Sequence, residues 1–205
     1  MIIQVANAAG PDDCHRLIVV YDRHVDRTKV MDQTGNPVVY WDQLSGEPDA
    51  AEIIPRLVQK CLCTLSDRLP FAEPLYPETV ILTALGVGGY HSRHADNVRQ
   101  NEQGDWVANH TPQRDVTAIY YLNDAFDGGE IVFERQQLAV RPRPGFLLAF
   151  PSDADHLHEV LPVRCGLRYT LAIWFTKQQC FALSMTALDA PAIAVCASVR
   201  SGELL

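Results

Sequence analysis

The chain contains the stretch Asp115-Val116-Thr117-Ala118-Ile119-Tyr120-Tyr121-Leu122, a run of β-branched and aromatic residues that predicts a β-strand. Similar runs lie on both sides of it, at 79–85, 130–133, 137–140, 146–150 and 168–175. Turn residues separate them, among them Asp127-Gly128-Gly129 and Pro142-Arg143-Pro144-Gly145. Many short strands with tight turns are typical of a sandwich or barrel, so we expect a mainly β core after Pro77.

The first 75 residues have a different pattern, which predicts helices joined by loops. One helix is expected to start at Pro11-Asp12-Asp13, and a second near Asp49, where apolar residues recur at three and four positions from Ile53 to Leu65. A chain of 205 residues suits one domain. We therefore predict a helical support at 1–77, a β core at 78–176 and a C-terminal extension at 177–205.

The formal net charge of −8 argues against nucleic acid or an anionic membrane surface as the main partner. No stretch of the chain is apolar and long enough to span a bilayer. The apolar start, Met1 to Val5, is too short for a secretory signal. These features favour a cytoplasmic protein, either a monomer or a homodimer, without nucleic acid or membrane partners.

The pattern His-x-Asp occurs twice, as His24-Val25-Asp26 and as His94-Ala95-Asp96. On a strand, residues two apart point to the same face, so both side chains can reach one ion. On a helix they point about 200° apart and cannot easily converge. His24 lies in a charged, helical stretch, which we interpret as a solvated face. His94 follows a strand and a glycine-rich bend, so the second pair is the stronger candidate for a metal site.

A further imidazole would complete this candidate site. Both His156 and His158 could face the same side of a strand, and the residues alone leave either open as the third ligand. Two imidazoles and one carboxylate suit non-haem Fe(II) and leave coordination positions open. Arg168 follows ten residues after His158, and its guanidinium fork can hold a carboxylate in a bidentate manner.

The pattern resembles the prolyl 4-hydroxylase-like group of 2-oxoglutarate and Fe(II) oxygenases, from about Glu78 to Phe175. The ordered landmarks are Tyr90-His91-Ser92-Arg93-His94-Ala95-Asp96-Asn97, Val116 to Asn123, Gly128-Gly129-Glu130 with Phe133, Pro144-Gly145, His158 to Val163, and Gly166-Leu167-Arg168-Tyr169. The resemblance implies a double-stranded β-helix, or jelly roll, with the N-terminal helices packed on one side.

The same resemblance implies the roles of single residues. Its spacing selects His158 as the third iron ligand and leaves His156 as a neighbour. It assigns Tyr121 and Arg168 to the 2-oxoglutarate C5 carboxylate, with Arg168 where many collagen-type relatives have Lys. Thr117 is a further residue at the co-substrate site. The implied cofactors are Fe(II) and 2-oxoglutarate, with ascorbate as a candidate reductant.

The implied activity is that of a dioxygenase, which hydroxylates an unactivated C–H bond with O2 and releases succinate and CO2. The carboxylate of Asp96 favours hydroxylation over halogenation, because a small residue there would leave a position for halide. The substrate stays open among a prolyl residue in a peptide, a free amino acid and a small biosynthetic intermediate.

Two other classes compete with this activity, and one segment has two interpretations. The competing classes are a non-catalytic module that senses iron or 2-oxoglutarate, and a cupin-like enzyme that does not use 2-oxoglutarate.

The segment 97–114 is polar, lacks a period and contains Trp106 and His110. It is either an irregular loop that closes over the substrate or a plain surface loop.

Overall fold

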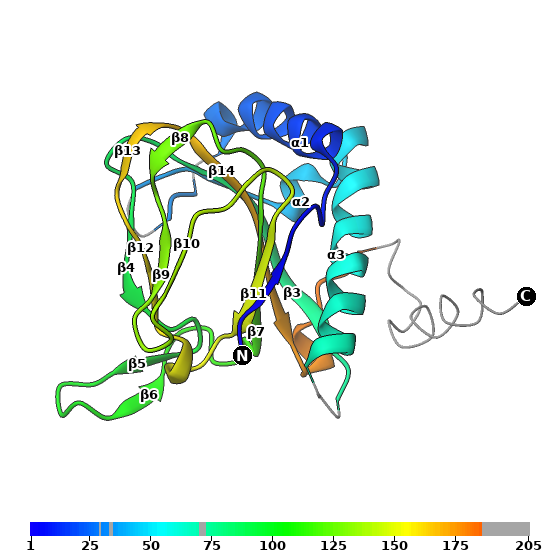
Figure 1. Ribbon diagram of the computed structural model, residues 1–205. Coiled ribbons are helices and arrows are strands. Elements are labelled where there is room, and N and C mark those ends of the chain that lie inside the picture. The colour runs from blue at the N-terminus through cyan, green and yellow to red at the C-terminus, as the bar shows by residue number, and fades with distance from the viewer. Residues whose placement is uncertain (29, 33–34, 70–72, 186–205) are drawn as a thin grey trace, which may run out of the picture.

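The computed structural model describes residues 1–28, 30–32, 35–69 and 73–185, and two antiparallel sheets that face each other form its centre (Figure 1). The larger sheet has the strand order β1 (Ile3–Val5), β11 (Leu147–Pro151), β7 (Val116–Tyr121), β14 (Arg168–Thr176), β3 (Tyr76–Leu85) and β2 (Val38–Tyr40). The smaller sheet has the order β10 (Leu138–Val140), β9 (Ile131–Phe133), β12 (His158–Val160) and β4 (His91–His94). Two-stranded ribbons pair β13 (Val163–Gly166) with β8 (Phe126–Gly128), and β5 (Val98–Gln100) with β6 (Trp106–Ala108).

The helices lie on one side of the larger sheet, as expected from the sequence (Figure 1). They are α1 (Pro11–His24), α2 (Trp41–Leu44) and α3 (Pro48–Arg68). Short 3-10 turns occur elsewhere along the chain, at η1 (Val25–Arg27), η2 (Ala154–His156) and η3 (Gln179–Phe181). The buried side of α3 packs on the sheet, and the hydroxyl of Tyr120 in β7 donates a 2.9 Å hydrogen bond to the Leu57 carbonyl of α3. None of the helices described is both long and apolar enough to cross a membrane.

Side chains of the central strands alternate between two buried regions. In β7, Val116, Ala118 and Tyr120 belong to the core under the helices, whereas Ile119 and Tyr121 face the space between the sheets. The same alternation in β14 places Leu171, Ile173 and Phe175 under the helices. The side chains of β14 on its other face line the interior between the sheets, and they are Arg168, Thr170, Ala172 and Trp174. The alternation therefore fixes which residues can take part in an interior site.

All six predicted strands are present, with ends that coincide or differ by up to three residues, and both predicted helices are confirmed. The prediction of only helices and loops before residue 75 is wrong at two places, because β1 pairs with β11 and β2 pairs with β3 along the larger sheet. Three-residue strands carry too little pattern to be seen without their partners. The predicted C-terminal extension lies outside the described residues from 186 onward.

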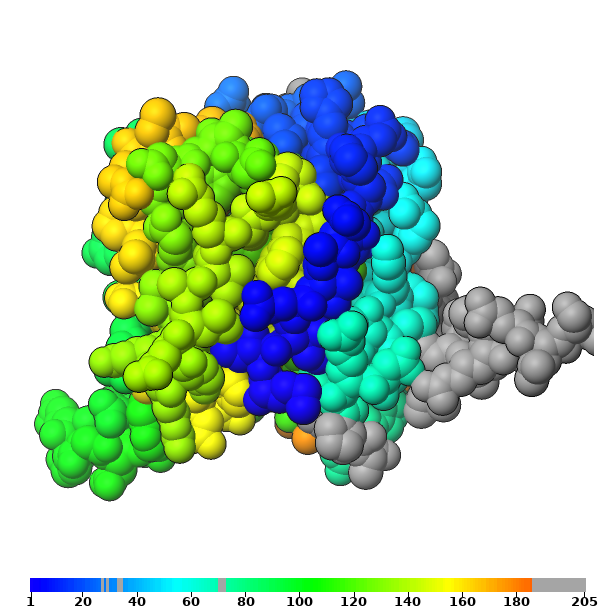
Figure 2. Space-filling view, in the orientation of Figure 1, coloured from blue at the N-terminus to red at the C-terminus, as the bar shows by residue number. Residues whose placement is uncertain are grey.

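The segment 97–114 is not the irregular loop expected from its polarity. Its strands β5 and β6 form a hairpin, in which Val98 pairs with Ala108 and Gln100 with Trp106. The hairpin projects from the body of the molecule, as the green tip at the lower left of Figure 2 shows. Trp106 is 42% exposed there, so it is not packed against the barrel.

Candidate functional site

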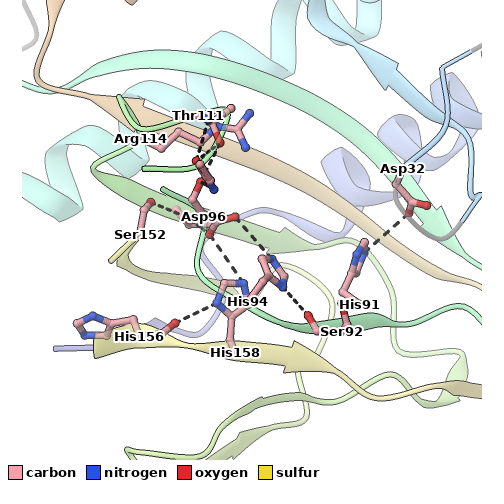
Figure 3. A network of polar contacts seen from close by, with 12 residues as sticks. Asp32, His91, Ser92, His94, Asp96, Thr111, Arg114, Ser152, His156 and His158 are labelled. Carbon is pink, nitrogen blue, oxygen red and sulfur yellow. Dashed lines mark hydrogen bonds and ion pairs between the residues drawn. The ribbon is translucent and has the colours of Figure 1, made fainter. Parts of the chain in front are cut away.

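His94, Asp96 and His158 come together at one end of the smaller sheet (Figure 3). His94 ends β4, Asp96 follows two residues later, and His158 begins β12 directly opposite His94 in the strand register. One potential ligand atom from each residue lies within 4.8 Å of the others. Nε2 of His94 and Nε2 of His158 are each 3.8 Å from an Asp96 carboxylate oxygen. Three donors at this separation can contact a single cation.

Backbone carbonyls orient both imidazoles. Nδ1 of His94 lies 2.7 Å from the Ser92 carbonyl, and Nδ1 of His158 lies 3.0 Å from the His156 carbonyl. A carbonyl only accepts, so Nδ1 carries the proton and donates in both rings. Nε2 is then the unprotonated nitrogen, and it faces Asp96. Metal-binding histidines in proteins are typically fixed in this way.

A hydroxyl pair supports the carboxylate of Asp96. The Thr117 hydroxyl, in β7, donates a 2.6 Å hydrogen bond to Oδ2 of Asp96 and lies 2.9 Å from the Ser152 hydroxyl. The backbone N–H of Asp96 also donates to the Ser152 carbonyl at 3.1 Å. Asp96 and Thr117 are 7% and 2% exposed, so these bonds are shielded from water. They hold the carboxylate in one orientation toward the imidazoles.

Burial and charge set the protonation states that a cation needs. Desolvation lowers the pKa of His158 to about 4, so this imidazole is neutral near pH 7. Burial alone would raise the pKa of Asp96, but the two imidazoles and the Thr117 hydroxyl together lower it below its usual value. A neutral imidazole and an ionised carboxylate are the forms that bind divalent metal.

The two other candidate histidines lie away from this group. Nε2 of His156 is 3.0 Å from the Met1 amino group, and its Nδ1 is 2.7 Å from an Asp153 carboxylate oxygen. His24, at the end of α1, lies 3.4 Å from Glu47. The interpretation of His24 as a solvated face is wrong, since its side chain is only 13% exposed. Among the candidates, the geometry therefore groups His158 with His94 and Asp96, and His156 contributes only its carbonyl.

Arg168 begins β14 and is 3% exposed. Its Nη2 donates to the Tyr121 hydroxyl at 3.1 Å, its Nε donates to the Gly129 carbonyl at 3.0 Å, and its guanidinium carbon lies 4.8 Å from the Tyr121 ring centroid. Gly129 has φ of +66°, and a Cβ there would lie 2.9 Å from Cδ of Arg168, so a larger residue would displace the arginine. Within the described part of the chain, no carboxylate lies within ion-pair distance of Arg168.

A cavity of about 320 Å³ connects these groups. Its wall includes the three candidate ligands, Arg168 and Thr117, and an apolar side formed by Val38, Ile81 and Ala172. Tyr121 does not belong to this wall and contacts Arg168 instead. A buried cation without an anionic partner is costly, so Arg168 is suited to bind an anion that enters the cavity.

The base of the β5–β6 hairpin is bonded to the candidate metal site. The side chains of Asn109 and Thr111 donate to the backbone carbonyl of Asp96 at 3.0 and 2.8 Å. The Asn97 amide donates to the Arg114 carbonyl at 2.9 Å and closes the segment. Asn109, Thr111 and Arg114 also line the cavity. A displacement of the hairpin would therefore be transmitted to Asp96.

Three polar residues of the cavity wall had no role predicted from the sequence, although His91 is part of a landmark of the resemblance. Arg114 stacks on the Trp174 ring at 4.1 Å and binds Glu78 at 3.1 Å, while Asp32 and His91 lie on the opposite side of the candidate ligands (Figure 3). His91 and His94 share the strand β4, but the sequence did not predict this short strand. Asp32 is remote in sequence and carries no local signal of its position.

Comparisons with known proteins agree with this geometry. Residues 80–176 match the sequence model of the 2OG-Fe(II) oxygenase superfamily. Prolyl 3-hydroxylase 2 of Mus musculus is 33% identical over 94 residues, which are 42% of this chain and 13% of that protein. Prolyl 3-hydroxylase 3 of Homo sapiens is 36% identical over 94 residues, with the same coverage. The chain thus matches only a small part of the length of these relatives.

Solved structures resemble most of the described fold. A viral collagen prolyl hydroxylase from Paramecium Bursaria Chlorella virus-1, in a 2OG complex, aligns with a TM-score of 0.64 and 18% identity over 89% of this chain and 96% of that one. A Pseudomonas putida prolyl-4-hydroxylase aligns with a TM-score of 0.65 and 22% identity over 86% of this chain and 92% of that one. These similarities confirm the expected double-stranded β-helix with helices on one side.

Proposed function

We propose that the protein is an Fe(II)- and 2-oxoglutarate-dependent dioxygenase that hydroxylates an unactivated C–H bond, because residues 80–176 match the sequence model of the 2OG-Fe(II) oxygenase superfamily and are similar to prolyl 3-hydroxylases. One observation carries this proposal. Three donors that can surround one cation, and a buried arginine without a carboxylate partner among the described residues, share one cavity of about 320 Å³. A metal and an anionic co-substrate are the two ligands that this combination suits.

The proposed iron ligands are His94, Asp96 and His158. Two neutral imidazoles and one carboxylate on one side of the ion leave positions open for other ligands. Bound iron would supply the redox chemistry that couples O2 and decarboxylation of 2-oxoglutarate to C–H hydroxylation, with release of succinate and CO2. The protein side chains orient the reactants: the carbonyls of Ser92 and His156 fix the imidazoles, and Thr117 fixes Asp96. Ascorbate is a candidate reductant.

Arg168 is the proposed anchor of the 2-oxoglutarate C5 carboxylate. Two of its donor groups are used by Tyr121 and Gly129, and the remaining N–H groups can reach an anion in the cavity. We assign Tyr121 to this subsite because its hydroxyl accepts a hydrogen bond from the guanidinium and so positions Arg168. We assign Thr117 to the co-substrate site as well, because it lines the same cavity, and its hydroxyl donates a hydrogen bond to Asp96.

The proposed substrate is a prolyl residue, a free amino acid or a small biosynthetic intermediate. The names of the relatives favour a proline-like group, and the cavity is at the small end of the range for ligand sites. We further propose a single cytoplasmic domain, monomeric or homodimeric, without nucleic acid or membrane partners. In it 1–77 is the N-terminal support, which contains the helices and the strands β1 and β2, 78–176 is the catalytic core and 177–205 is an extension.

The test is the turnover of 2-oxoglutarate by the purified protein with Fe(II) and O2. We expect succinate and CO2 to form, faster with a true substrate, and a product heavier by one oxygen in mass spectra of amino acid and prolyl peptide mixtures. Asp96→Ala should abolish both signals, whereas Asp42→Ala, an exposed residue of α2, should not. Binding of iron and 2-oxoglutarate without succinate would indicate a sensing module. Product formation without 2-oxoglutarate would indicate a cupin-like enzyme.

A further inference from the structure

Asp32 and His91 form a polar pair in the cavity, on the side away from Arg114 (Figure 3). Nε2 of His91 lies 3.9 Å from Oδ2 of Asp32, and the two side chains are 27% and 12% exposed. His91 is on β4, the strand that carries His94, and its ring centroid is 6.4 Å from the His94 ring centroid. Asp32 comes from the N-terminal part of the chain, outside the residues 80–176 that match the oxygenase superfamily. The pair thus adds a group from outside the shared core to the cavity wall.

Backbone and side-chain hydrogen bonds fix the position of Asp32. The backbone N–H of Asn36 donates to Oδ1 of Asp32 at 2.8 Å, and the backbone N–H of Asp32 donates to the Asn36 carbonyl at 2.8 Å. The Gly35 N–H donates to the Asp32 carbonyl at 3.1 Å. The segment that follows continues into β2, where Val38 pairs with Thr83 of β3. The carboxylate is therefore held against His91 by the fold.

This arrangement selects one tautomer of His91. The carboxylate attracts the imidazole N–H, so the proton is favoured on Nε2, which faces Asp32. Nδ1 of a neutral ring is then a hydrogen-bond acceptor. No residue in the described ranges hydrogen-bonds to this Nδ1. The cavity therefore has an acceptor that the described protein groups do not satisfy.

A second polar group on the wall is also unsatisfied. The Thr83 hydroxyl oxygen is buried without a hydrogen-bond partner among the described residues, although Thr83 is only 8% exposed and lines the cavity. Buried polar groups in proteins are nearly always paired, so an unpaired one on a cavity wall is suited to bind a polar group that enters the cavity. Thr83 pairs with Val38 of β2, the strand that follows Asp32, so this part of the wall is built with the N-terminal segment.

We propose that His91 is a specificity-determining residue, positioned by Asp32, that accepts a hydrogen bond from an N–H or O–H group of the substrate. The proposal rests on the proposed oxygenase function and adds the chemical class of one substrate group. The apolar side formed by Val38, Ile81 and Ala172 receives the carbon skeleton. His91 and Thr83 bind the polar group that lies beside it.

The test compares two probes that share a pyrrolidine ring. L-prolinamide carries N–H donors, whereas 1-acetyl-L-proline dimethylamide carries none. Their binding is measured on protein loaded with Mn(II) and 2-oxoglutarate, by water proton relaxation. We expect L-prolinamide to bind about tenfold more tightly, the effect of about one hydrogen bond. His91→Phe should bring the ratio of the two affinities close to one.

Asp32→Asn provides a second and independent variant. An asparagine amide can donate to Nε2, which favours the proton on Nδ1, so the preference should shift toward the probe without donors. His15→Phe and Asp42→Asn, at exposed positions of α1 and α2, should leave the ratio unchanged. Mn(II) and 2-oxoglutarate affinities should stay at the parent level in all variants, which separates a folding defect from a loss of recognition.

Three results would overturn the proposal: equal affinity for the two probes in the parent protein, no measurable binding of either, or a preference that survives His91→Phe. Each of them leaves the oxygenase function intact, because that function is judged by succinate formation. Conversely, a protein that binds the probes as expected but never forms succinate would keep the recognition site and lose the proposed activity.

Discussion

The Thr117 hydroxyl lies 2.6 Å from Oδ2 of Asp96 and donates a hydrogen bond to it inside the barrel. This contact orients the carboxylate that we propose as an iron ligand. Thr117→Val should lower Fe(II) affinity by about 10- to 100-fold, the range for lost supporting groups at metal sites. Thr117→Ser keeps the hydroxyl and should retain most of the parent Fe(II) affinity. Calorimetric titration with Fe(II) under anaerobic conditions measures the affinities of both variants. An Fe(II) affinity of the valine variant equal to that of the parent protein would show that the hydrogen bond is dispensable.

His158→Ala and His156→Ala distinguish the two histidines of the η2–β12 segment. His158→Ala removes a proposed ligand and should lower Fe(II) affinity more than the loss of a supporting group does. His156→Ala keeps the backbone carbonyl that binds Nδ1 of His158, so Fe(II) affinity should stay within about threefold. The same anaerobic titration decides between them. Full affinity in His158→Ala, with loss in His156→Ala, would make His156 the third ligand.

Arg168→Ala tests the co-substrate anchor. Loss of a charge-assisted, bidentate contact should weaken 2-oxoglutarate binding by roughly 1.5–3 kcal/mol, about one to two decades in affinity. Fe(II) affinity should change little, because Arg168 is not a proposed ligand. Arg164→Ala is the matched control, since Arg164 is exposed and pairs with Asp127 on the surface. The dependence of succinate formation on 2-oxoglutarate concentration measures the effect, and an unchanged dependence would refute this assignment.

The β5–β6 hairpin provides a prediction about closure over the substrate. If it closes, protease cleavage within 97–114 should slow when iron, 2-oxoglutarate and substrate are all bound, because bound segments open less often. Trp106→Ala, at the exposed tip, should raise the ratio of succinate to hydroxylated product, while Trp106→Phe should retain coupling. Mass spectrometry of the cleavage fragments gives the cleavage rate, and mass spectrometry of the reaction products gives the ratio of succinate to hydroxylated product. Equal cleavage and equal coupling would leave the hairpin as a surface element.

Much of the fold could be predicted from local pattern. The run from Val116 to Leu122 and the run from Arg168 to Phe175 have the composition and alternation of strands, and both lie at the centre of the larger sheet. Central strands are buried on both faces, so their sequences must be apolar and β-branched, and the signal is strong. Short strands such as β2 and β4 form because a neighbour offers hydrogen bonds, and that neighbour is remote in sequence.

For the site, the sequence by itself determined which residue types can bind a metal and an anion: the spacing of His94 and Asp96 on extended backbone, and an arginine ten residues after His158. The residue pattern alone left His156 and His158 open, and the family resemblance selected His158. Only the tertiary structure gives the physical reason, because β12 pairs with β4 and the preceding turn directs His156 toward Met1 and Asp153. Only the tertiary structure brought Asp32 to His91. Their contact depends on how the N-terminal segment packs against the barrel, and no local periodicity encodes a long-range contact of that kind.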